Sequence, residues 1–117
     1  MSILSRFTGP TLPSVDATTA HDRPRGVLLV DVREPSEWAG GHAPAAYHQP
    51  LGRLDPARLP TADAYYVICR SGNRSELATM MFQARGFEAY NVEGGMEAWA
   101  SESLPFAASD GQPGRVA

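Results

Sequence analysis

The chain has 117 residues, a net charge of −3, and a content of 43% hydrophobic and 20% charged residues, which is ordinary for a single globular domain. This balance argues against nucleic-acid and acidic-membrane partners, which favour a basic face. No stretch approaches the roughly 20 apolar residues of a membrane span, and we expect a cytoplasmic protein. There is no lysine for a Schiff base, and the single cysteine excludes an intrachain disulfide.

Three segments are expected along the chain: a leader over residues 1–13, one domain over residues 14–106, and a flexible C-terminal tail over residues 107–117. The leader contains no apolar run of signal-peptide length. The tail is rich in Gly, Ser and Pro, and we expect it to be loosely held.

In the first half of the domain, residues 27–32 form an apolar run of the kind buried on both faces of a parallel sheet. Pro35 fits the first turn of a short helix over residues 35–39, which Gly40 and Gly41 end. Residues 46–49 are a second candidate strand, and residues 55–59 a short helical turn.

In the second half, aromatic and β-branched residues predict a strand over residues 65–68. Apolar residues at helical spacing predict a helix over residues 75–85, with Gly86 as its stop. A strand over residues 89–92 and a helix over residues 96–101 follow. Strands that alternate with helices indicate an α/β fold with a mainly parallel central sheet flanked by helices.

The segment that carries chemistry is the junction between the strand at 65–68 and the next helix. Cys69 ends the strand, and a polar loop with Gly72 follows. Ligands bind at the carboxyl ends of strands in such sheets, and a helix N-terminus and loop amides favour an anion there. Arg70 and Arg74 add positive charge, so the loop favours the thiolate form of the cysteine. An inert core cysteine is the alternative, but two arginines and a glycine in the loop favour function.

The chain resembles the rhodanese (thiosulfate sulfurtransferase-like) family. The matching motifs run in the family's order over about residues 27 to 104. They are Leu29-Val30-Asp31-Val32-Arg33-Glu34, Glu37-Trp38, Gly41-His42, Pro50-Leu51, Cys69-Arg70-Ser71-Gly72-Asn73-Arg74-Ser75, and Val92-Glu93-Gly94-Gly95-Met96-Glu97-Ala98-Trp99. One departure is Ala43-Pro44-Ala45, where the family often has Ile-Pro-Gly.

The resemblance implies a three-layer fold in which Cys69 forms a persulfide. The substrate-binding loop would be Arg70, Ser71, Gly72, Asn73 and Arg74, with Ser75, Asp31 and Arg33 in support. The loop from Cys69 to Arg74 has six residues, the length of sulfurtransferases, whereas related phosphatases and arsenate reductases have seven. Asp31 and Arg33 could orient the loop or bind substrate, but we favour a structural ion pair or a turn contact.

Several other residues have structural interpretations. Glu37 and Trp38 are expected to pack the short helix, and His42 to have a capping or turn role rather than that of a base. Gly94 and Gly95 are expected to form a turn near the site. The histidines show no metal-ligand spacing with Cys69, so we expect no metal and no cofactor.

The function expected from these residues is transfer of a sulfane sulfur through a Cys69 persulfide. The donor would be a thiosulfate-like anion, and the acceptor a thiol, cyanide or a sulfur-carrier protein. The alternatives are a phosphatase or arsenate reductase that uses the same thiolate, and a non-catalytic binding module that keeps only the fold.

Overall fold

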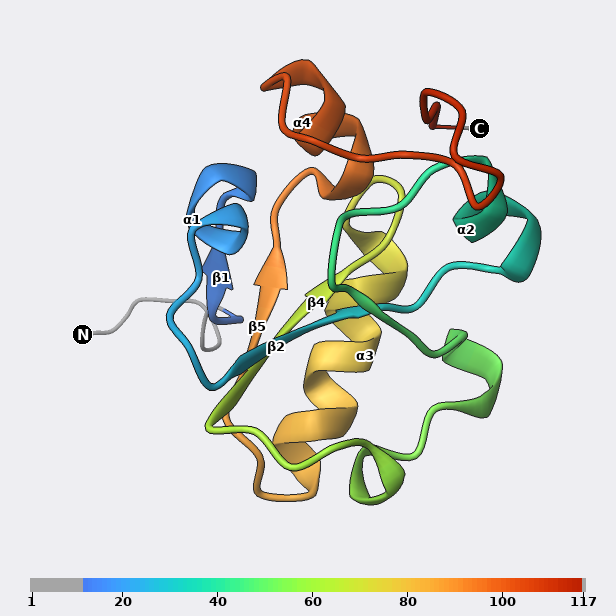
Figure 1. Ribbon diagram of the computed structural model, residues 1–117. Helices are drawn as coiled ribbons and strands as arrows, with labels where there is room; N and C mark the ends of the chain where they lie inside the picture. The colour runs from blue at the N-terminus through green and yellow to red at the C-terminus, as the bar shows by residue number, and fades with distance from the viewer. Residues whose placement is uncertain (1–11, 117) are drawn as a thin grey trace.

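The computed structural model describes residues 12–116, so the expected leader lies outside the described residues except for its last two positions. A five-stranded sheet forms the centre, and every strand pair in it is parallel. Its spatial order is β1-β5-β4-β2-β3 (Figure 1). The strands are β1 Ser14–Val15, β2 Val27–Asp31, β3 Tyr47–His48, β4 Ala64–Ile68 and β5 Ala89–Val92. The predicted α/β fold with a parallel sheet is confirmed.

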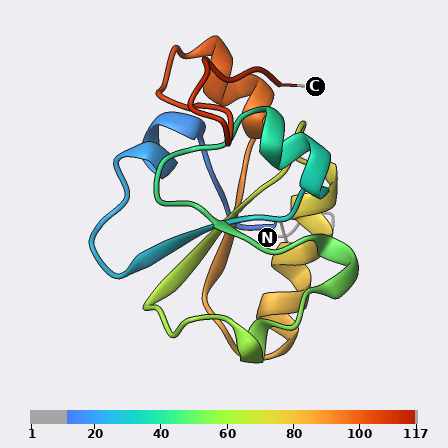
Figure 2. The same ribbon diagram turned by 45° about the vertical axis from the view of Figure 1, so that its right-hand side comes forward.

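Helices cover both faces of this sheet and give three layers. They are α1 Ala17–His21, α2 Pro35–Gly40, α3 Asn73–Ala84 and α4 Gly95–Ser101, with two short 3₁₀ turns, η1 Leu51–Arg53 and η2 Pro56–Arg58. The core under α3 and the 3₁₀ turns includes Val67 and Phe82, whereas the core under α1 and α4 includes Ile68 and Trp99. Figure 2 shows α3 and α1 on opposite sides of the sheet.

The central strand β4 places the candidate nucleophile. All five of its residues are buried, because β2 and β5 flank it and both of its faces are covered. Val30 and Asn91 lie on either side of Val67 in the parallel register. A strand that is covered on both faces is apolar along its whole length, which explains the run of aromatic and β-branched residues from which this strand was predicted. Its carboxyl end therefore delivers Cys69 to the middle of the sheet edge.

Most elements differ from their predicted bounds by about one residue, and α3 differs the most. The long helix α3 begins at Asn73, two residues before the predicted start, so Asn73 and Arg74 belong to its first turn. The sequence reading missed β1 and α1. A two-residue strand and a five-residue helix are too short for periodicity, although Asp16 caps α1 by accepting a hydrogen bond from the Thr19 N–H at 2.8 Å.

The C-terminal segment after α4 differs from the loosely held tail that its composition suggested. Ala107 and His42 exchange backbone hydrogen bonds of 3.0 and 3.2 Å, and the Arg115 N–H donates to the Gly40 carbonyl at 2.9 Å. Phe106 and Val116 pack against the core under α1 and α4. These apolar anchors and backbone bonds hold residues 105–116 against the end of α2. Figure 1 shows the C-terminus there.

Ala45 has a backbone conformation that matches the departure seen in the sequence. Its φ is 61°, in the left-handed region that favours glycine. The family often has glycine at this place, so the alanine accepts a strained conformation that the turn requires.

Among residues 12–116, no helix is both long and apolar enough to cross a membrane.

Candidate active site

Cys69 lies directly after β4, with its side chain beneath the turn that leads into α3. The residue is 1% exposed. Its Sγ accepts hydrogen bonds from the Gly72 N–H at 3.1 Å and from the Ser75 hydroxyl at 3.2 Å. Gly72 has a φ of 112°, which only glycine adopts easily, and it is the N-cap of α3. The turn thus curls over the sulfur and directs a backbone donor at it.

The Ser75 hydroxyl has several acceptors around it. Besides the sulfur, these are the Asn91 Oδ1 at 2.5 Å and the Gly72 carbonyl at 3.2 Å. A hydroxyl has one proton, so it serves one acceptor at a time and can turn toward the sulfur when the sulfur is charged. Asn91 is buried on β5. Sequence reasoning missed it, and the available signal was a single amide in an otherwise apolar strand.

The predicted turn at Gly94 and Gly95 does approach the site. The Met96 N–H donates to the Cys69 carbonyl at 2.8 Å, and the Glu97 N–H donates to the Arg70 carbonyl at 3.0 Å. A Cβ at Gly95 would collide with the Cys69 carbonyl oxygen, and its φ of 56° also favours glycine. The first turn of α4 therefore holds the backbone of the loop in place at Cys69 and Arg70.

Arg74 joins the first turn of α3 to α2. Its guanidinium makes a two-pronged ion pair with Glu37, with hydrogen bonds of 2.7 and 2.8 Å. The hydrogen-bonded guanidinium lowers the pKa of Glu37 from 4.5 to about 2, against the opposing effect of burial. Glu37 in turn raises the pKa of Arg74, and negative charge on Cys69 adds to that rise. Glu37, expected only to pack its helix, is thus the partner of the arginine that closes the loop.

The other loop residues lie at the surface. Arg70 is about half exposed and pairs with Glu97 of α4 at 3.1 Å. Ser71 and Asn73 are exposed as well. The predicted loop therefore divides into a buried group around the sulfur, with Gly72 and Ser75, and an exposed rim.

Asp31 and Arg33 form a fully buried ion pair at the same sheet edge. Their shortest contact is 2.8 Å, and both side chains are 0% exposed. The guanidinium also donates to the Gly41 carbonyl at 2.7 Å and to the Glu37 carbonyl at 3.3 Å. The pair thus joins the end of β2 to the backbone of α2 and of its C-cap residue Gly41.

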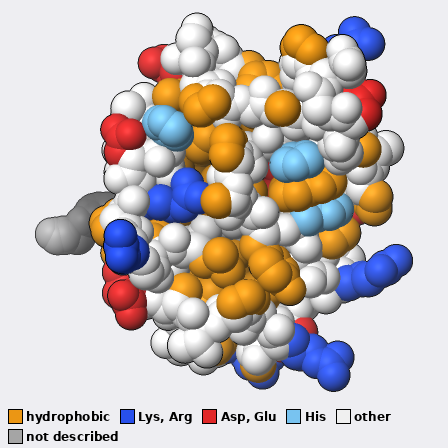
Figure 3. Space-filling view, in the orientation of Figure 1, with side chains coloured by type: hydrophobic (Ala, Val, Ile, Leu, Met, Phe, Trp, Pro, Cys, Tyr) orange, Lys and Arg blue, Asp and Glu red, His pale blue; other side chains and the backbone are white. Residues whose placement is uncertain are grey.

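Trp38 lies between two histidine rings. The His42 ring stacks at 3.7 Å and the His48 ring at 4.6 Å. The His42 Nδ1 lies 2.7 Å from the Trp38 carbonyl, which fits the turn role expected for it. Figure 3 shows histidine side chains beside hydrophobic ones on this face, near α2.

No cluster of three or more His, Cys, Asp or Glu suited to a metal ion occurs within residues 12–116.

Comparisons with known proteins find relatives in both sequence and fold. The Rhodanese-like domain profile matches residues 15–102. The protein slr1261 of Synechocystis sp. is 44% identical over 82 residues, which are 68% of this chain and 46% of that protein, so the chain spans about half of that relative. A sulfurtransferase of Allochromatium vinosum is 39% identical over 89 residues, which are 73% of this chain and 82% of that protein.

Among solved structures, the thiosulfate sulfurtransferase of Pseudomonas aeruginosa superimposes with a TM-score of 0.76 at 28% identity. The match covers 88% of this chain and 21% of that one. The parallel sheet, the cysteine at its edge and a family match over most of the chain agree with one another. This chain belongs to the rhodanese-like domain family.

Proposed function

We propose that this chain is a sulfurtransferase that carries a sulfane sulfur as a persulfide on Cys69. The observation that carries the proposal is the pair of donors, the Gly72 N–H and the Ser75 hydroxyl, aimed at the Cys69 sulfur. Donors placed around one sulfur atom stabilise negative charge on a thiolate or on a terminal sulfur beside it. The family membership and the sulfurtransferase of Allochromatium vinosum support the same reaction class.

The reaction is a two-step covalent exchange. The Cys69 thiolate attacks the outer sulfur of thiosulfate, the sulfur–sulfur bond of the donor breaks, and sulfite leaves with the bonding electron pair. A Cys69 persulfide anion remains. An acceptor nucleophile then attacks the outer sulfur and restores the thiolate. The acceptor is cyanide in an assay, which gives thiocyanate, and a thiol or a sulfur-carrier protein in the cell.

The exposed rim of the loop has a binding role in this scheme. Arg70 lies at the surface beside the turn over Cys69, where an anionic donor must approach. Glu97 balances part of its charge, so the attraction for the donor is moderate. Arg74, held by Glu37, keeps the first turn of α3 in position rather than contacting the donor.

Loop size favours sulfur transfer over phosphate-ester hydrolysis. Six residues run from Cys69 to Arg74, and the Gly72 N–H lies only 3.1 Å from the sulfur. A cradle this close suits one added atom better than a tetrahedral oxyanion centred above the sulfur. A non-catalytic binding module is less compatible with the chain, because the nucleophile and its two donors are all present.

Two activity assays run in parallel test this proposal. Thiocyanate formation from thiosulfate and cyanide should be catalysed, and hydrolysis of p-nitrophenyl phosphate should stay at the level of the Cys69→Ser variant. Phosphatase turnover without thiocyanate formation would replace the proposal with the phosphatase alternative. Absence of both activities in folded protein would favour the binding module.

A further inference from the structure

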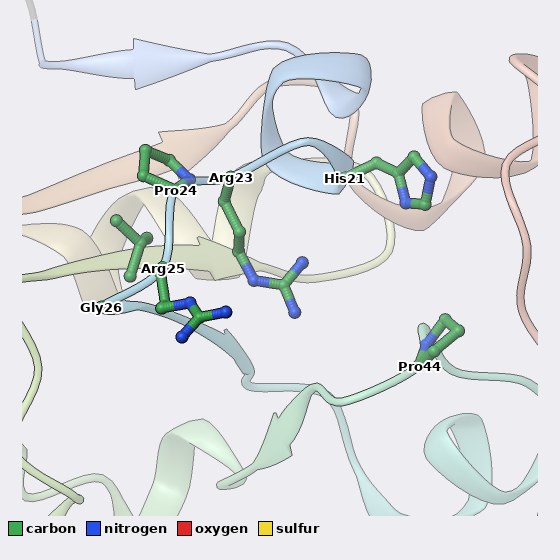
Figure 4. A pocket seen from close by; sticks show the side chains of 7 residues that line it. His21, Arg23, Pro24, Arg25, Gly26 and Pro44 are labelled. Atoms are coloured by element: carbon green, nitrogen blue, oxygen red, sulfur yellow. The ribbon is translucent and has the colours of Figure 1, made fainter.

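A second charged feature lies between α1 and the start of β2, in a pocket of about 350 Å³ (Figure 4). Its lining contains no residue of the loop from Cys69 to Ser75. The lining includes His21, Arg23, Pro24, Arg25, Val27 and Pro44. Figure 4 shows the guanidinium groups of Arg23 and Arg25 extending from one segment into the hollow, with His21 and Pro44 across from them.

The two arginines lack carboxylate partners within the described part of the chain. No Asp or Glu oxygen of residues 12–116 lies within 4.0 Å of either guanidinium. Arg23 is partly buried and donates one hydrogen bond, from Nη1 to the Ala20 carbonyl at 3.0 Å. Burial lowers the pKa of Arg23, because removal from water disfavours its charged form.

Two cations that border one hollow repel each other, and the partly buried one has lost hydration. An anion in the pocket would relieve both costs. Guanidinium groups suit phosphate because their N–H groups form paired hydrogen bonds to its oxygens. Pro24, Val27 and Pro44 add apolar surface to the lining for the organic part of a ligand, and the volume is that of a small-molecule site.

We propose that this pocket binds a small phosphate monoester through Arg23 and Arg25. The site is separate from Cys69 and does not depend on the sulfurtransferase proposal. A phosphate carries close to two negative charges at neutral pH, so the two cations match it better than they match a monocarboxylate.

The test uses phenyl phosphate as the probe and benzoate as the singly charged comparison, with binding followed by backbone amide NMR shifts of the full chain. Shifts should concentrate in residues 20–27, and phenyl phosphate should bind at least about tenfold more tightly than benzoate. Arg23→Gln and Arg25→Gln should each weaken binding about tenfold or more. Arg25 is exposed, so its variant should change the free energy of unfolding by no more than about 0.5 kcal/mol.

Arg58→Gln is the matched control, since it removes the same charge from an exposed arginine of η2 outside the pocket. It should change affinity less than about twofold. The Arg23 and Arg25 variants should leave the rate of thiocyanate formation unchanged. The proposal is overturned if phenyl phosphate shifts the amides of residues 70–75 instead, if Arg70→Gln rather than Arg23→Gln abolishes binding, or if the probe does not bind.

Discussion

Two polar clusters lie at the carboxyl edge of the sheet, one after β2 and one after β4, and they use their hydrogen-bonding groups differently. After β2, the Arg33 guanidinium donates to Asp31 and to two backbone carbonyls, and both side chains are completely buried. After β4, the Cys69 sulfur is met by the Gly72 N–H and the Ser75 hydroxyl. The first cluster is an ion pair satisfied by its own chain, whereas the second surrounds the sulfur that we propose as the nucleophile.

This difference suggests a structural role for the cluster after β2 and a chemical role for the cluster after β4. Both Nη atoms of Arg33 donate hydrogen bonds, to Asp31 and to backbone carbonyls of α2 and its C-cap, so the cluster anchors α2. Sulfur is a weak acceptor, and donors aimed at it gain most when its charge increases or when it acquires a second sulfur. We therefore expect changes in the first cluster to affect stability and changes in the second to affect turnover.

The largest expected effect on turnover comes from Cys69→Ser. Thiocyanate formation should fall by at least about a thousandfold, because the only thiol is lost. Serine has nearly the same volume but buries a hydroxyl in the core, so the free energy of unfolding should fall by no more than about 3 kcal/mol and the variant should remain folded. Steady-state kinetics and urea unfolding measure the two. Substantial turnover in the folded variant would refute the persulfide mechanism.

The largest expected effect on stability comes from Asp31→Ala. The substitution leaves the Arg33 charge buried without its partner, which costs about 3–5 kcal/mol of unfolding free energy. Arg85→Gln is the control, because it breaks an exposed pair with Asp55 and should cost under about 1 kcal/mol. Equal losses in urea unfolding would show that the buried pair has no special structural role.

Ser75→Ala tests whether the hydroxyl in the Cys69 cluster contributes to sulfur transfer. Loss of the hydroxyl removes one of the two donors to the sulfur, and a donor to a charged group contributes about 1.5 kcal/mol or more. We expect kcat/KM for sulfur transfer to fall about tenfold. Ser101→Ala on the exposed side of α4 is the control and should have wild-type kinetics. A wild-type rate in Ser75→Ala would place the hydroxyl proton on Asn91 alone.

The smallest expected effect concerns the Glu37–Arg74 pair, which lies between the clusters. Because the pKa of Glu37 is lowered in the folded protein to about 2, the pair stabilises the fold above pH 4.5, and this contribution is lost as the pH falls toward 2. Glu37→Gln should cost about 1 kcal/mol at pH 7, since the pair is partly exposed to solvent. The difference from wild type should vanish near pH 2. A difference that is independent of pH would refute the ionic origin.

Most of the sheet and the position of Cys69 at its edge were predictable because their signals are local. The apolar run that became β4 and the turn with Gly72 lie within ten residues of each other. The Glu37–Arg74 pair and the Ser75–Asn91 contact join residues 37 and 16 positions apart. Only the tertiary arrangement brings these residues together: the place of β5 beside β4 for Asn91, and the position of α2 near the start of α3 for Glu37. No local pattern identifies them.

For the C-terminal segment, a local signal was present in the sequence but did not predict the contacts that the segment makes. Its Gly, Ser and Pro content predicted loose chain, but composition does not show whether backbone groups find partners. Here Phe106 packs against Gly41 and Gly114, where a Cβ would lie 2.9 and 2.6 Å from its ring. Gly41 at the end of α2 thus lets the segment approach that helix closely, and Gly114 makes room for Phe106 within the segment itself.

Intact-mass spectrometry of the protein after treatment with thiosulfate tests the central claim most directly. The chain has no second cysteine to attack a persulfide internally, so the added sulfur should persist after desalting without thiols. We predict a gain of one sulfur atom that is absent in Cys69→Ser and is removed when cyanide is added. No gain, spontaneous loss without an acceptor, or a disulfide-linked dimer as the main product would contradict a Cys69 persulfide protected by its loop.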